Sequence, residues 1–117
     1  MNVALLKKIR ARILRHPSKF RMDVYTCGTA HCIGGWACVL AGKTLDPLTN
    51  ETTNGGQPWN VAGAILRLKP AQRNRLFHQW EWPEQFQEKY HAAKRRDRRA
   101  RIAAARIDHF IATNGAE

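Results

Sequence analysis

The sequence predicts an all-α protein, with a single compact domain over residues 1–117 that is built from five or six short helices. Apolar residues recur with helical spacing near both ends of the chain. Prolines stand where helices are expected to begin or end. No stretch of useful length alternates between apolar and polar residues with the two-residue period of a half-buried strand. These three observations together favour helices over strands throughout.

Composition limits the class of protein before any motif is considered. A chain of 117 residues with 44% apolar residues can bury one core, which argues against general disorder. No run of 18 apolar residues is present, so no transmembrane helix is expected. Lys7, Lys8 and Arg10 interrupt the first apolar stretch, which is unlike a signal peptide. Three cysteines are too few, and odd in number, for a disulfide scaffold, so a reducing cytoplasm is the expected compartment.

The first half of the chain begins with the expected helix over residues 2–15. Asn2 is suited to its N-cap, and the His16-Pro17 pair ends it because a residue before proline avoids the α region. Residues 18–26 are expected to be irregular, with Phe20, Met22 and Tyr25 as packing anchors.

A second helix is expected over residues 29–41, with Thr29 as a possible N-cap and Gly42 as the C′ residue. Gly34 and Gly35 lie inside it, and each costs about 1 kcal/mol relative to alanine. They indicate either a close contact with a neighbouring backbone or a break in the helix.

The second half begins with a polar loop over residues 43–57. Pro58, Pro70 and Pro83 then predict helices over residues 58–68, 70–77 and 84–96. The last helix is the clearest, because its small and apolar residues follow a helical repeat up to Asn114-Gly115. These residues are Ala100, Ala103, Ala104, Ile107 and Ile111. The alanines are expected to let another helix approach closely.

The ten residues CGTAHCIGGW, at positions 27–36, resemble a signature that recurs in a family of small uncharacterised proteins of bacteria and phages. The family signature reads C-G-T, then a variable residue, then His or another residue, then C-x-A-G-W. The resemblance continues in residues 16–25, in Leu76-Phe77 with Trp82-Pro83, and in residues 103–111. It implies no particular activity. The chain departs from the family pattern at Gly34, where alanine is more usual, and in the strongly basic residues 94–99.

The cysteine motif supports three interpretations. Cys27, His31 and Cys32 are candidate catalytic residues of a thiol enzyme or redox protein, because amides at a helix N-terminus lower thiol pKa values. Adding Cys38 gives four soft ligands, but their spacings do not match the paired motifs of zinc sites, so no metal is predicted. The third interpretation is that Cys32 and Cys38 are small buried apolar residues of the core.

Basic residues outnumber acidic ones by 20 to 9, which leaves a formal net charge of +11. They gather in residues 7–21, 67–75 and 94–101, a clustering that favours nucleic-acid binding. The candidate contacts are Lys7, Lys8, Arg12, Arg15, Arg73, Arg75, Lys94, Arg95, Arg96, Arg98, Arg99 and Arg101. On the last helix, Arg98, Arg101 and Arg106 are expected around the polar face. A solvated basic surface and an acidic protein partner remain alternatives.

The tryptophans add one open question. Trp36 is expected in the core, whereas Trp80 and Trp82 either fill the corner before Pro83 or stack on bases. No cofactor is predicted, and no catalytic constellation is complete. The leading hypothesis is a small basic cytoplasmic protein that binds nucleic acid or a nucleoprotein complex, with an accessory role in a phage or mobile element as one form of it. The alternatives are the thiol-based protein described above and a protein–protein interaction module.

Overall fold

The computed structural model describes all 117 residues and is all-helical, as predicted. Its elements are α1 (Val3–Arg15), the 3-10 turn η1 (Pro17–Lys19), α2 (Ile33–Leu40), α3 (Pro58–Ile65), α4 (Pro70–Phe77), the 3-10 turn η2 (Gln79–Glu81), α5 (Glu84–Ala92) and α6 (Arg96–Ala112). Three isolated β-bridges occur, but no strand forms. None of the helices combines the length and the apolar character needed to cross a bilayer.

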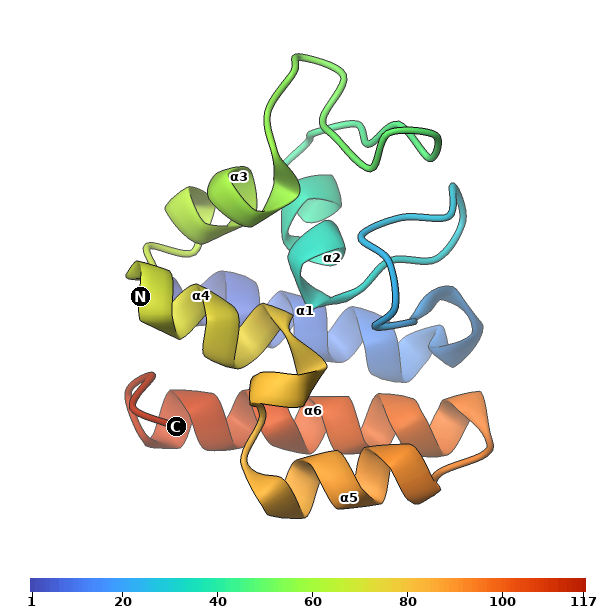
Figure 1. Cartoon of the computed structure of the whole chain (residues 1–117), viewed down its shortest axis with the longest axis vertical. Coiled ribbons are helices and arrows are strands. Elements are labelled where there is room, and N and C mark those ends of the chain that lie inside the picture. Colours follow the sequence, from blue (N-terminus) through green and yellow to red (C-terminus); the bar gives the residue numbers. More distant parts are fainter.

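The two longest helices, α1 and α6, pack side by side in opposite directions (Figure 1). Arg10 on α1 pairs with Asp108 late in α6, at 2.8 Å, whereas Ser18 just after α1 contacts Arg96 at the start of α6. Apolar residues of both helices fill the space between them: Leu5, Leu6, Ile9 and Ile13 from α1, and Ala100, Ala103, Ala104, Ile107 and Phe110 from α6. Ala100, Ala103 and Ala104 are buried in this core.

Helix α2 begins four residues later than predicted. The expected N-cap was Thr29, but the helix starts at Ile33 and Cys32 is its N-cap, with Sγ accepting from the Gly35 amide at 3.4 Å. The preceding residue, His31, is held in extended form by η1, because its amide donates to the Lys19 carbonyl oxygen at 3.0 Å. This contact between residues distant in sequence keeps His31 out of the helix, so α2 begins only at Ile33.

The two glycines of α2 mark a close approach, not a break. A Cβ atom on Gly35 would lie 2.0 Å from the carbonyl oxygen of Tyr25, and one on Gly34 would lie 2.9 Å from the Tyr25 ring. The segment 18–31 can cross this helix face only because the face carries no side chains. Trp36, the residue directly after Gly35, is buried as predicted.

Two other helix ends differ from prediction. Helix α3 ends at Ile65 instead of Leu68, because Arg67 takes a left-handed conformation (φ 57°) and the Leu68 amide turns back to the Gly63 carbonyl oxygen at 2.8 Å. Glycine is the usual residue at this C′ position. Because Arg67 stands there instead, the sequence did not indicate that the helix ends early. Helix α5 ends at Ala92 instead of Arg96, because Ala93 is extended, and Arg96 already belongs to α6. Helix α4 has the predicted bounds.

The position predicted for Arg106 was wrong. The sequence placed it on the polar face of the last helix, but its side chain is fully buried. Its Nη2 donates to the carbonyl oxygen of Arg75, at 2.9 Å, and to a backbone oxygen of Glu117, the last residue of the sequence. The rings of Phe86 and Phe110 flank the guanidinium. An arginine can occupy this site because backbone oxygens and aromatic faces replace part of its hydration.

Candidate functional site

A cleft of about 710 Å³ lies at the end of the molecule where α1 finishes and α6 begins. Its walls come from residues 18–30, from η2, from the end of α5 and from the start of α6. The polar and aromatic side chains that line it include Arg21, Asp23, Cys27, Trp80, His91, Arg96 and Arg99. The site therefore draws on segments that are far apart in the sequence.

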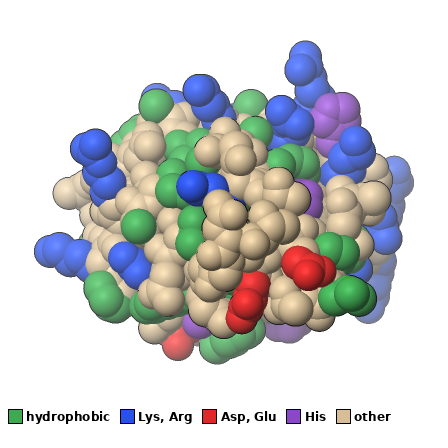
Figure 2. Space-filling model, turned by 90° about the horizontal axis from the view of Figure 1, so that it is seen from above, with side chains coloured by type: hydrophobic (Ala, Val, Ile, Leu, Met, Phe, Trp, Pro, Cys, Tyr) green, Lys and Arg blue, Asp and Glu red, His purple; other side chains and the backbone are tan.

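The antiparallel packing of α1 and α6 places two of the three basic clusters at the same end. Arg96 Nη1 donates to the Ser18 carbonyl oxygen at 3.1 Å, which joins the start of the 94–101 cluster to the end of the 7–21 cluster. Lys and Arg side chains crowd the right-hand edge in Figure 2, and this edge corresponds to the right-hand end of Figure 1, where α1 ends and α6 begins. We call residues 15–21 and 94–99 the basic end.

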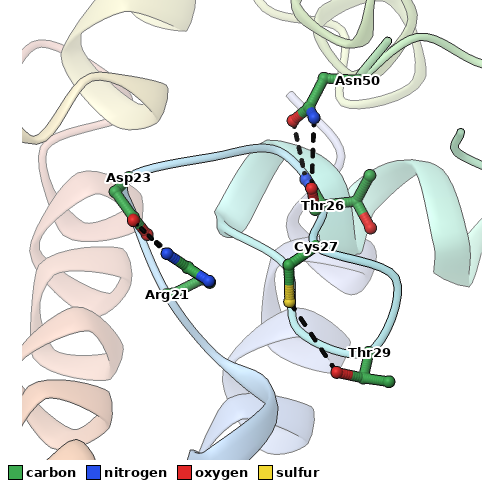
Figure 3. A network of polar contacts seen from close by, with 6 residues as sticks. All are labelled: Arg21, Asp23, Thr26, Cys27, Thr29 and Asn50. Carbon is green, nitrogen blue, oxygen red and sulfur yellow. Dashed lines mark hydrogen bonds and ion pairs between the residues drawn. The ribbon is translucent and has the colours of Figure 1, made fainter. Parts of the chain in front are cut away.

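Within the cleft, Arg21 is paired and the two α6 arginines are not. Arg21 binds the Asp23 carboxylate through Nε and Nη2, and this contact holds the pKa of Asp23 below its usual value (Figure 3). Arg96 and Arg99 hydrogen-bond only to backbone oxygens, Arg99 through Nε to Ala93 at 2.9 Å. The Arg99 guanidinium also lies over the Tyr90 ring, 5.3 Å from its centroid. Because a carbonyl does not neutralise a guanidinium, these two arginines keep their full charge for an anionic ligand.

Cys27 is the one exposed cysteine, and it lies in the same cleft. The loop that follows it turns at Gly28, where φ is +99°, and this turn directs the amides of Thr29 and Ala30 at the sulfur. These amides lower the pKa of the Cys27 thiol to about 7. The Thr29 hydroxyl lies 3.8 Å from Sγ (Figure 3). A large fraction of Cys27 is therefore thiolate at neutral pH.

Asn50 fixes this loop from the outside. Its side-chain oxygen accepts from the Thr26 amide at 3.0 Å, and its side-chain nitrogen donates to the Thr26 carbonyl oxygen at 3.2 Å (Figure 3). Thr26 Oγ1 in turn accepts from the Gly28 amide at 2.9 Å. The polar loop 43–57 thus supports the residues that surround Cys27.

The structure separates the three residues of the predicted thiol site. Cys32 and Cys38 are buried, as the core interpretation predicted, and burial raises their pKa values to about 12 and about 11. His31 is also buried, which lowers its pKa, and its ring packs edge-on against Trp36 at 4.7 Å. Neither His31 nor Cys32 lines the cleft, so Cys27 lacks the neighbouring base that the sequence suggested.

The other predicted nucleic-acid contacts divide into four groups. Lys7, Lys8, Arg12 and Arg15 are exposed along α1. Arg98 and Arg101 line a second groove of about 380 Å³ between α5 and α6, together with Lys89. Arg73 and Arg75 contribute to the fold, because Arg73 Nε binds the Leu68 carbonyl oxygen at 2.9 Å and Arg75 Nη1 binds that of Gly115 at 3.1 Å. Lys94 and Arg95 are exposed in the turn before α6.

The sequence did not single out two of the residues that line the cleft, Arg21 and Trp80. Arg21 lies in the first basic cluster, but only the position of the 18–30 segment distinguishes it from its neighbours. Trp80 projects from η2 into the cleft wall with 67% of its surface exposed, whereas Trp82, two residues away, is buried. The sequence around Pro83 does not show which of the two tryptophans is exposed, because both lie in the same short corner before that proline.

No group of three or more His, Cys, Asp or Glu side chains is arranged to hold a metal ion. In comparisons with known proteins, the chain matched no family model, no curated protein and no solved structure. The resemblance of residues 27–36 to the small bacterial and phage proteins therefore remains a prediction.

Proposed function

We propose that this protein binds nucleic acid at the basic end, with the cleft as the centre of the interface. The observation that carries the proposal is the convergence of Arg96 and Arg99 in one cleft, each bound to a backbone oxygen and unpaired with any carboxylate. Arginine recognises phosphate through two parallel N–H groups, and each of these side chains has its Nε or one Nη anchored while other N–H groups stay free. The proposed ligand is therefore a phosphate backbone.

The charge around the cleft supports a polyanion over a single small anion. Lys19, Lys94 and Arg95 are exposed beside it, and exposed basic residues continue from it along α1. Charges arranged over such a distance neutralise successive phosphates and release their counterions. Binding is then expected to weaken steeply with salt, by at least about tenfold between about 50 and about 200 mM.

The test is fluorescence anisotropy with labelled oligonucleotides at several salt concentrations. Arg96→Gln and Arg99→Gln are each expected to weaken binding and to reduce the slope of log K against log salt by about 0.7 to 0.9. Lys43→Gln is the matched control, because it removes the same charge from an exposed position after α2, outside the cleft. Thermal unfolding of each variant shows whether its fold is kept. The proposal would be overturned if all three substitutions changed the affinity equally, or if the affinity did not depend on salt concentration.

A second candidate function is chemistry at the Cys27 thiol. The observation that favours it is an exposed sulfur in a cavity, with two backbone amides directed at it. In this case the thiolate acts as a nucleophile that displaces a leaving group from a substrate held in the cleft. Screening with electrophilic probes at neutral pH tests this candidate. Labelling of Cys27 no faster than that of a free cysteine at the same pH would remove the support for it.

A further inference from the structure

The exposed indole of Trp80 distinguishes the cleft from an ordinary basic surface. The other three tryptophans donate their indole N–H to protein oxygens: Trp36 to Lys19, Trp59 to Asn74 and Trp82 to Leu76. Trp80 makes no such bond. One face of its ring is stacked on His78, with a distance of 4.6 Å between ring centroids and an angle of 9° between planes. This stack fixes the plane of the indole and leaves it exposed at the cleft wall.

We propose that the cleft binds unpaired, single-stranded nucleic acid, with one base stacked on Trp80 and adjacent phosphates bound by Arg96 and Arg99. This proposal rests on the proposed function and specifies its ligand. A flat aromatic ring beside a cationic groove is the arrangement that proteins use to bind single strands, because every base offers a π-face. In a duplex both faces of each internal base are already covered by neighbours, so the indole has nothing to stack on.

The size of the cleft agrees with this ligand. Its volume of about 710 Å³ lies within the range of roughly 300 to 1,000 Å³ that holds drug-sized ligands, a size class that includes a nucleotide. Trp80 comes from η2, while the two arginines come from the start of α6, so base and phosphate would contact different elements of the cleft lining. His91 and Gln79, which lie 3.1 Å apart between Nε2 atoms, line the same cleft and offer polar contacts to a base edge.

The first part of the test compares a labelled oligothymidylate with a duplex of the same length. Trp80→Ala is expected to weaken binding of the single strand by about tenfold or more, while Trp80→Phe retains most of the affinity. Duplex binding should not change. Leu48→Ala is the matched control, because Leu48 is another large apolar side chain that is exposed, at 93%, and it lies outside the cleft. Trp80 is exposed, so its truncation is not expected to unfold the protein, and circular dichroism checks this.

The second part uses Cys27 as a reporter inside the cleft. Iodoacetamide is expected to alkylate Cys27 alone in the folded protein, and saturating oligothymidylate should slow this reaction several-fold. Poly-glutamate at the same concentration of negative charge should slow the alkylation of Cys27 less than oligothymidylate does. This readout does not depend on substitution of any residue.

The outcomes separate this inference from the proposed function. If Trp80→Ala binds the single strand as tightly as the native protein while Arg96→Gln and Arg99→Gln weaken it, the stacking inference is wrong and binding is purely electrostatic. If no oligonucleotide binds, both proposals fail. If poly-glutamate protects Cys27 and oligothymidylate does not, the partner is an acidic protein segment and the single-strand inference is overturned.

Discussion

The carbonyl oxygen of Tyr25 rests directly on the backbone of Gly35, so that a Cβ atom at position 35 would lie 2.0 Å from it. Both groups in this contact belong to the backbone, so a rotamer change cannot separate them. The contact fixes the segment 18–31 against α2, and this segment forms one wall of the cleft. The geometry of the cleft therefore depends on a residue that does not line it.

Gly35→Ala is expected to destabilise the protein by at least about 2 kcal/mol, because overpacking against a backbone cannot be relieved by a rotamer change. Gly34→Ala is the comparison. Its Cβ would meet the movable Tyr25 ring at 2.9 Å, and the gain in helix propensity of about 1 kcal/mol offsets the shift. Urea unfolding measures both free energies. Equal stability of the two variants would contradict the packing described here.

Alkylation of Cys27 should follow the pH dependence of its thiolate. Only the thiolate reacts, and the pKa of Cys27 is about 7, so the rate rises as pH increases through 7. Between about pH 6 and about pH 8 the increase is about tenfold, as the titration curve of a single group requires. Mass spectrometry locates the modification. Cys32 and Cys38 should react only after unfolding, because both are buried, and Cys27→Ser should leave no fast phase.

Asn50→Gly is expected to raise the pKa of Cys27 toward the usual value of a thiol. Glycine accepts the left-handed backbone at this position (φ 57°) but removes both hydrogen bonds to Thr26, so the amides near Sγ are held less firmly. The loss of stability should be about 1 to 2 kcal/mol. The pH midpoint of alkylation and urea unfolding test the two effects.

The control for this change is Asn54→Gly, which is the same substitution at an exposed position of the same loop. It should alter neither the midpoint nor the stability by a comparable amount. An unchanged midpoint in Asn50→Gly would show that the 26–30 loop keeps its geometry without support from the polar loop.

Arg106→Met is expected to keep the free energy of unfolding within about 1 kcal/mol of the native value or to raise it. The buried guanidinium leaves Nε and Nη1 without partners, and burial lowers the pKa of Arg106 to about 10. Methionine fills a similar volume without that cost. Arg106→Ala should lose about 2 kcal/mol or more, because it leaves a cavity. A loss from methionine as large as that from alanine would mean that the bonds to backbone oxygens outweigh the burial of charge.

The sequence by itself determined the helical class and most helix starts. Asn2, Pro58 and Pro70 act within a single turn of backbone, and the structure confirms each of them at the start of its helix. The repeat of small and apolar residues in α6 also predicted its buried face, because that pattern depends only on helical geometry. Helix ends were less predictable where a residue such as Arg67 takes the conformation usually reserved for glycine.

The tertiary structure alone decided which charges and thiols are accessible and which lie together. Cys27 and Cys32 are five positions apart, yet Cys27 is exposed in a cleft and Cys32 is buried. The residue between them that decides this is His31, whose backbone pairs with residues 19 and 20 and so holds the chain against the η1 segment just before Cys32. Arg99 lines the cleft while Arg106, two turns along the same helix, is buried under aromatic rings. Local signals set backbone dihedral angles, but exposure and proximity follow from how helices distant in sequence pack, and the antiparallel pairing of α1 with α6 brought the two basic clusters to one end.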